Sequence, residues 1–93
     1  MYKDVYLLEP THDGRKSFNG KAQVLIKENG DLILRSYNTD VATISWSSGI
    51  KKAEVYEIYS PTSLRHIKEF LLQNKFKADN KKQIVNDYLK SET

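Results

Sequence analysis

An Asn29-Gly30 pair between two runs of alternating apolar residues constrains this chain more than any other feature, because it predicts a β-hairpin. A two-residue turn on this pair would mix apolar and polar residues on each face of the hairpin. A three-residue loop over 28–30 instead pairs Val24 with Leu34, separates the two kinds of residue, and places Gly30 where a left-handed conformation is needed. We therefore predict the second register.

The rest of the first sixty residues also alternates between short apolar runs and turn-forming residues. Strands are predicted over 5–8, 40–46 and 52–59, in addition to the two strands of the hairpin. A long loop is expected between the first strand and the hairpin, and a bulge is expected near Tyr56 or Glu57 in the last strand. Short strands joined by tight turns indicate an antiparallel meander of about four or five strands.

The last third of the chain predicts two helices, over about 61–74 and about 80–91. Ser60 followed by Pro61 is typical of a capped helix start. Each helix has an apolar stripe: Leu64, Ile67, Phe70 and Leu71 in the first, and Ile84, Val85, Tyr88 and Leu89 in the second, for which Asp79 is the expected cap. The fold class is therefore predicted to be α+β, with the sheet over about 3–59 and one helix packed on it, in a single domain of residues 1–93.

Composition excludes several kinds of chemistry. The chain has no Cys, which excludes disulfides, thiolate catalysis and cysteine zinc sites. His12 and His66, the two histidines, have no converging set of further ligands in the sequence, so we expect neither a metal ion nor another cofactor. Without an activated serine elbow or a glycine-rich phosphate loop, we predict that the protein is not an enzyme.

The chain lacks a membrane signal. No apolar run approaches the ~20 residues that a membrane helix needs. Residues 1–10 do not follow the signal-peptide pattern of basic, apolar and small residues. We therefore expect a cytoplasmic protein with no membrane partner.

Aromatic residues favour a protein-binding function. Six Tyr, three Phe and one Trp are more than so small a core requires, and Tyr and Trp are typical anchors of interfaces. A sheet covered by a helix on one face also leaves its other face and an edge strand free for a partner. The alternative is that Trp46 and some tyrosines belong to the core. The candidate anchors are Tyr2, Tyr37, Tyr56, Tyr59 and Trp46.

A basic C-terminal third supports nucleic-acid binding as the alternative function. The net charge is +3, and residues 61–93 hold seven basic and four acidic side chains. Lysines can contact phosphates, although the same cluster also fits a solvated loop between two helices. The candidate contacts are Arg35, Lys75, Lys77, Lys81 and Lys82.

Three stretches of the chain match the motifs of a known family in the same order. They read SFNGKA at 17–22, SYNTDVA at 36–42 and YSPTSLRHIKEFL at 59–71. On these stretches the chain resembles a family of short, uncharacterised proteins carried by phages, plasmids and genomic islands of Gram-positive bacteria. Pro61 and Ser63 stand where Ala and Thr are usual in that family, and both are compatible with a helix start.

The resemblance implies an accessory gene of a mobile element, whose product modulates or inhibits a host protein or nucleoprotein. Anti-CRISPR proteins that bind Cas nucleases are one such class. A net charge of +3 argues against DNA mimicry, which needs a strongly negative surface. Partner contacts are expected where the motifs carry groups able to specify a partner, namely at Tyr37, Thr39, Tyr56, Tyr59, Arg65 and His66.

Overall fold

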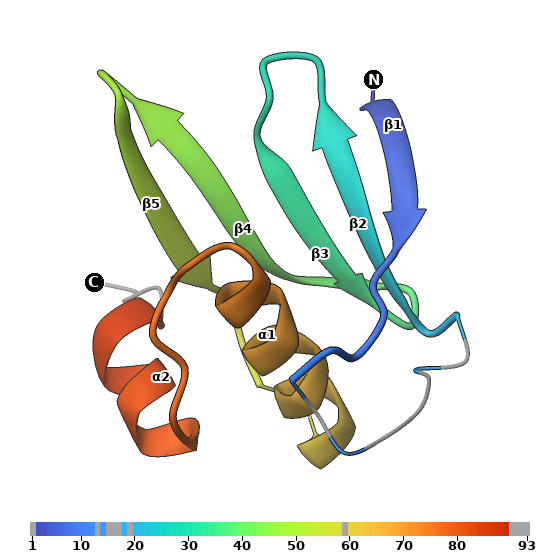
Figure 1. Cartoon of the computed structure of the whole chain (residues 1–93), viewed down its shortest axis with the longest axis vertical. Coiled ribbons are helices and arrows are strands. Elements are labelled where there is room, and N and C mark those ends of the chain that lie inside the picture. Colours follow the sequence, from blue (N-terminus) through green and yellow to red (C-terminus); the bar gives the residue numbers. More distant parts are fainter. Residues whose placement is uncertain (1, 13, 15–17, 19, 59, 90–93) are drawn as a thin grey trace.

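The computed structural model describes residues 2–12, 14, 18, 20–58 and 60–89 of the chain. A five-stranded antiparallel sheet forms one layer, and helix α1 lies across one face of it, with helix α2 beside α1 (Figure 1). This arrangement confirms the predicted α+β class. Within the described part of the chain, neither helix is long and apolar enough to cross a membrane.

The sheet is a meander in which each strand pairs with its neighbour in sequence, in the order β1-β2-β3-β4-β5. Its strands are β1 (Tyr2–Leu7), β2 (Ala22–Lys27), β3 (Leu32–Ser36), β4 (Thr39–Ser47) and β5 (Ile50–Val55).

The β2–β3 hairpin has the predicted register. Val24 pairs with Leu34, and Ala22 pairs with Ser36. Gly30 has φ +95, and its N–H donates to the Lys27 carbonyl over 2.9 Å, which closes the three-residue loop. The prediction is confirmed because only this register keeps the apolar side chains of both strands on the face that α1 covers.

The predicted bulge is wrong in position. β5 keeps one register along its length and ends before Tyr56 and Glu57. A bulge instead lies in β4, where the pairing with β3 shifts beside Arg35. As a result Val41 and Ala42, which are neighbours in sequence, are both fully buried. A regular strand would have placed Val41 on the opposite face.

Helix α1 (Pro61–Gln73) has the predicted start and stripe. The Ser60 hydroxyl accepts a hydrogen bond from the Ser63 N–H over 3.1 Å, and Pro61 occupies the first turn. Three members of the stripe are fully buried and Leu64 is half-buried against the same core; the three are Ile67, Phe70 and Leu71.

Helix α2 (Lys81–Tyr88) is shorter than predicted and has a different cap. Asn80, not Asp79, caps it, with its side-chain oxygen accepting the Gln83 N–H over 2.9 Å. Asp79 instead donates its own N–H to the Gln83 side chain over 2.7 Å. The amide side chain of Asn80 therefore caps the helix in place of the predicted Asp79 carboxylate.

Only part of the predicted α2 stripe is buried. Ile84 is fully buried, whereas Val85 and Leu89 are each more than a third exposed. Leu89 ends the helix and forms a parallel bridge to Val55 at the edge of β5. Residues 90–91 of the predicted helix lie outside the described residues.

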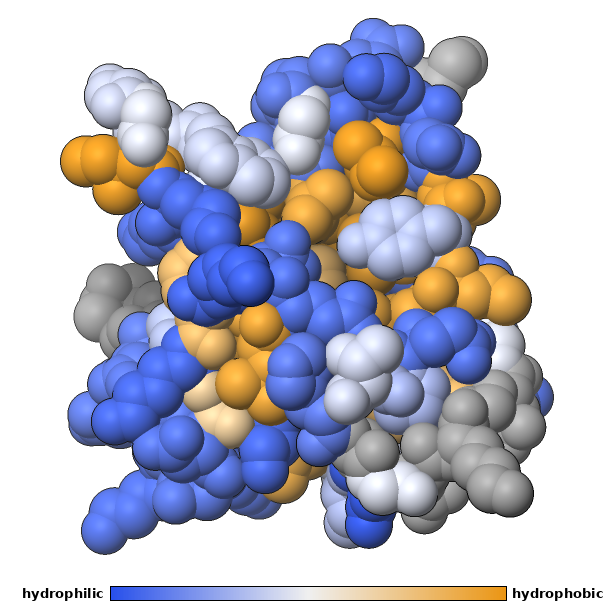
Figure 2. Space-filling view, viewed as in Figure 1, coloured by the Kyte–Doolittle hydropathy of each residue, from blue (hydrophilic) through white to orange (hydrophobic). Residues whose placement is uncertain are grey.

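The helix-side face of the sheet is divided into two halves, because α1 spans only part of the length of the strands (Figure 1). In the covered half, Val24, Leu34 and Ala42 are fully buried under α1. Figure 2 shows apolar side chains gathered on the same face beyond α1. We call this region the open half, and we define it by four residues: Tyr6, Ile26, Leu32 and Trp46.

Candidate functional site

The strand register brings the apolar residues of the open half together on one face, with Asp4 opposite Ile26 at the β1 edge. Ile26 pairs with Leu32 across β2 and β3, and both side chains are half-buried. Trp46 follows the fully buried Ile44 by two residues on β4, and 45% of its surface is exposed. Tyr6 on β1 is 41% exposed. Two large aromatic side chains thus flank an aliphatic floor.

Lys51 lies at the border between the covered half and the open half. Lys51 on β5 donates from Nζ to the Asn74 carbonyl at the end of α1. The same ammonium lies 4.9 Å from the ring centroid of Phe76, a cation–π distance. These two contacts hold the ammonium at this border.

Tyr37 and Thr39, two predicted partner contacts, share the β3–β4 turn at the opposite end of the sheet. Tyr37 is 49% exposed and has φ +59, a conformation that a bulky residue rarely adopts. Its N–H donates to the Lys21 carbonyl over 2.7 Å, and its ring centroid lies 6.0 Å from that of His66. These contacts hold the turn in place.

His66, another predicted partner contact, is buried in the structure. Its side chain is 1% exposed, on the face of α1 that packs against the sheet. Its Nδ1 lies 2.8 Å from the Ser36 hydroxyl, and the Phe18 ring packs edge-on at 4.6 Å. His66 therefore holds α1 on β3, because a polar side chain at this depth needs an internal partner.

The remaining predicted contacts are spread over the molecule. Tyr56 follows β5 and is 39% exposed. Arg65 lies on the solvent side of α1, where it lines a cleft of about 40 Å³ with His12 and Lys68. Tyr59 lies outside the described residues. The predicted set therefore does not form one site.

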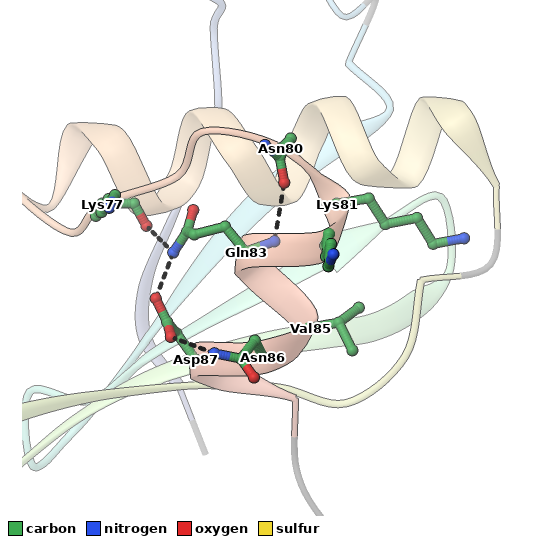
Figure 3. Close-up of a pocket in the computed structure, with 8 residues that line it drawn as sticks. Lys77, Asn80, Lys81, Gln83, Val85, Asn86 and Asp87 are labelled. Atoms are coloured by element: carbon green, nitrogen blue, oxygen red, sulfur yellow. Dashed lines mark hydrogen bonds between the residues drawn. The ribbon is translucent and has the colours of Figure 1, made fainter.

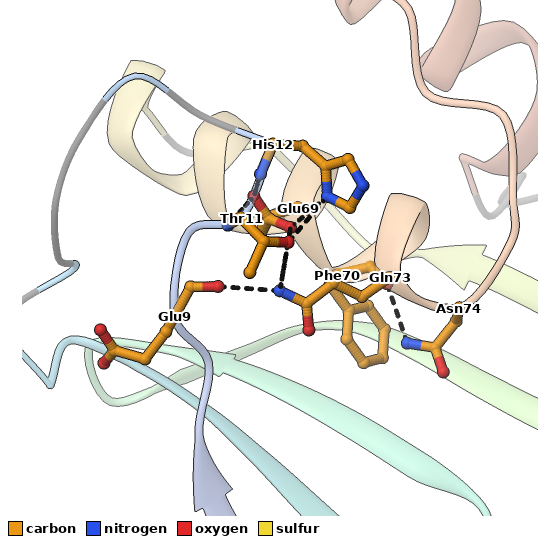
Figure 4. Close-up of polar contacts among 7 residues, drawn as sticks. All are labelled: Glu9, Thr11, His12, Glu69, Phe70, Gln73 and Asn74. Atoms are coloured by element: carbon orange, nitrogen blue, oxygen red, sulfur yellow. Dashed lines mark hydrogen bonds and ion pairs between the residues drawn. The ribbon is translucent and has the colours of Figure 1, made fainter.

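Glu69 is a polar centre that the sequence reasoning did not identify (Figure 4). Its carboxylate is 1% exposed and holds the loop after β1 against α1. It accepts the N–H of Thr11 over 2.9 Å and of His12 over 2.7 Å. The Thr11 hydroxyl, the His12 Nδ1 and the Gln73 amide approach it to 3.0, 2.7 and 2.9 Å. The sequence held one signal of this role, because Glu69 stands beside Phe70 within the apolar stripe of α1.

These contacts determine the charge state of Glu69. Burial by itself would raise the pKa of the carboxyl, but the hydrogen bonds from His12, Gln73 and Thr11 outweigh burial and lower the pKa to about 2. The carboxylate is therefore ionised near neutral pH. Because five donors already surround it, it has little capacity left for proton transfer or for a metal ion.

Three of the five predicted nucleic-acid contacts lie together at α2 and the loop that precedes it. Lys77, Lys81 and Lys82 line an open hollow on the solvent side of this helix, with a volume of about 950 Å³ (Figure 3). Polar amide side chains, including those of Asn80 and Gln83, line the same hollow. This grouping was not evident from the sequence, since the lysines belong to a loop and a short helix.

The other two predicted basic contacts lie elsewhere, and the hollow itself is only weakly charged. Arg35 lies on the sheet, where its Nε donates to Asp40 over 2.8 Å; this hydrogen bond raises the pKa of the guanidinium. Lys75 follows the end of α1 with φ +70. Within the hollow, Lys77 lies 3.5 Å from Asp79 in an exposed ion pair, which offsets part of its charge.

The described residues contain no group of three or more His, Cys, Asp or Glu side chains that could hold a metal ion. They also contain no buried side-chain nitrogen or oxygen that lacks a hydrogen-bond partner. The polar groups at depth thus serve to hold elements together.

Comparison with known proteins gives a match to a family model. The model of a family of unknown function, DUF8033, matches residues 6–86. Neither the curated proteins nor the solved structures gave a match.

Proposed function

The chain belongs to DUF8033, a family of unknown function, and we propose from its geometry that it is a non-enzymatic binding protein that docks a partner protein on the open half. One observation carries the proposal. Tyr6 and Trp46, each more than 40% exposed, flank the half-buried Ile26 and Leu32 on a face that the molecule's own helix leaves uncovered.

The physical argument rests on what a partner would remove from water. Trp and Tyr are enriched among the residues that dominate binding free energy, since each removes a large apolar area at a low cost in side-chain entropy. The aliphatic floor between them offers further apolar surface at about 25 cal/mol per Å². The Lys51 ammonium beside it keeps its hydrogen bond to the Asn74 carbonyl when a partner docks, and this bond offsets part of the cost of desolvating the charge.

The class of partner is proposed from the motif resemblance and from charge. The resemblance suggests a host protein or nucleoprotein in the cytoplasm, with Cas nucleases as one class. The net charge of +3 is unsuited to imitating DNA. The protein would therefore act by covering a protein surface or by blocking a conformational step of its partner.

A pull-down from bacterial lysate, with and without nuclease treatment, tests the proposal. The baits are the wild type, Trp46→Ala and, as a matched control, Tyr37→Ala, which removes an equally exposed aromatic ring from the other end of the sheet. We expect one protein that survives nuclease treatment, is captured by the Tyr37→Ala bait, and binds Trp46→Ala about 30-fold more weakly, as at a hot spot.

Two results would contradict the proposal. If Trp46→Ala kept the partner while Tyr37→Ala lost it, the binding site would be the β3–β4 turn. If nuclease treatment removed the partner from every bait, the contact would be with nucleic acid.

Nucleic-acid binding is the second candidate, and the grouping of Lys77, Lys81 and Lys82 around one hollow favours it. Contacts between lysine and phosphate give an affinity that falls steeply with salt. A mobility-shift assay across a salt series should then show a shift at low salt that is lost when these three lysines are replaced by alanine. No shift at low salt would remove this candidate.

A further inference from the structure

The outer edge of β1 is a second surface, left without a paired strand by the described part of the chain. All six residues of the strand are exposed, and Val5 and Leu7 are 51% and 52% exposed. The Leu8 N–H donates to the Ala22 carbonyl over 2.9 Å. Because hydrogen-bonded pairs alternate along an antiparallel ladder, the backbone groups of Val5 and Leu7 point away from β2, toward the open edge.

The two edges of the sheet differ in what covers them. At the β5 edge, Leu89 bridges to Val55, and two consecutive lysines, Lys51 and Lys52, discourage pairing. At the β1 edge, no described segment pairs with the strand on its outer side. This edge is therefore the better site for another strand.

Two features of the β1 edge limit its pairing with another strand. The Asp4 carboxylate accepts the outward N–H of Val5 over 2.8 Å. A register shift between Tyr2 and Asp4 makes Lys3 a bulged residue. Bulges and charged side chains limit unwanted pairing at sheet edges. The regular part of the edge is thus reduced to Asp4–Leu7.

We propose that this edge pairs antiparallel with the same edge of a second copy of the chain. The two-fold axis would pass beside Tyr6, with Val5 opposite the partner's Leu7. This register joins the outward backbone groups of both residues in both copies, which gives four hydrogen bonds. The register centred on Val5 would instead need the bulged Lys3 to pair with the partner's Leu7.

The side chains are complementary in this register. On the sheet face away from the helices, Val5 would lie against the partner's Leu7, and both extend an apolar strip that already contains Leu25, which is 6% exposed. On the helix side, the two Tyr6 rings would meet at the axis, and the phenol of a tyrosine is uncharged near neutral pH. No like charges would face each other across the new ladder.

Asp4 opposes this pairing. In the monomer its carboxylate occupies the Val5 N–H. In the dimer that N–H donates to the carbonyl of the partner's Leu7, so the hydrogen bond to Asp4 must break first. One short strand per copy also places the interface below about 1,200 Å², the range of weak association. We expect a dissociation constant on the order of 100 µM.

Sedimentation equilibrium of the purified chain tests the proposal, from about a tenth of the expected dissociation constant to about ten times it. We expect the wild type to change from monomer to dimer over this range. Leu7→Lys and Val5→Lys should each weaken the dimer at least tenfold, because each places a charge against an apolar partner residue. Asp4→Ala should tighten the dimer several-fold.

Ile50→Lys is the matched control, since Ile50 is 70% exposed at the far end of the sheet, and it should leave the dimer unchanged. Circular dichroism checks that each variant is folded. A wild type that stays monomeric, a dimer that survives both lysine substitutions, or a dimer that Asp4→Ala weakens would overturn the proposal. No partner protein is present in this experiment, so its outcome is independent of the proposed function.

Discussion

The covered and open halves belong to the same strands and the same sheet face, yet their side chains differ in exposure to solvent. In the covered half the side chains are fully buried, including that of Ala42. In the open half Trp46, the largest side chain in the protein, is 45% exposed. Alternation along a strand determines which face a residue joins. Where α1 lies determines whether that face is buried. The comparison assigns stability to the covered half, and the proposed function places binding on the open half.

The largest expected effect comes from breaking the covered half. Phe70 is fully buried between α1 and the sheet, so Phe70→Ala removes its apolar contacts and leaves a cavity. We expect a loss of about 3–5 kcal/mol in the free energy of unfolding, measured by urea denaturation. Leu64→Ala, at a half-buried position of the same stripe, is the control and should cost clearly less.

The second-largest effect is expected from acid, which should lower the free energy of unfolding through Glu69. Its pKa is lowered from the ordinary 4.5 to about 2, so the folded state binds the proton less readily than the unfolded state. The resulting stabilisation is complete above pH 4.5 and is lost as the pH falls toward 2. It amounts to as much as about 3 kcal/mol. Urea denaturation of the wild type and of Glu69→Gln over this pH range measures it.

The difference between these two proteins isolates Glu69 from the other carboxylates. We expect the wild type to be the more stable near neutral pH and its advantage to shrink as the pH falls from 4.5 to 2. An advantage that stays constant over this range would show that Glu69 does not titrate as described.

The smallest effect on stability is expected in the open half. Trp46 is nearly half exposed, so Trp46→Ala should change the free energy of unfolding by about 1 kcal/mol or less. Thermal denaturation of the two proteins measures this difference. A loss as large as that of Phe70→Ala would assign Trp46 to the core and would remove the division of roles between the halves.

Much of the fold could be predicted because its signals are local. The register around Gly30 follows from the apolar pattern of two adjacent strands, and the Ile67–Leu71 stripe follows from helical spacing. The β4 bulge could not be predicted in the same way. Val41 fits a regular strand in the sequence, and only the packing of α1 on β3 and β4 favours turning it inward.

The candidate site was predicted less well than the fold. His66 sits in a motif with several polar residues, and nothing local indicates that Ser36, thirty positions earlier, would be its partner at depth. Glu69 likewise meets Thr11 and His12 only after the chain has folded. Long-range polar pairs of this kind leave no periodic pattern in a sequence.

The sequence by itself therefore determined the elements, the hairpin register and the apolar side of α1, because each depends on neighbours within a few positions along the chain. Tertiary structure alone decided which of those apolar and polar groups meet water. A helix of 13 residues cannot cover five strands along their whole length. The position at which α1 packs leaves Tyr6 and Trp46 exposed while it encloses His66 and Glu69.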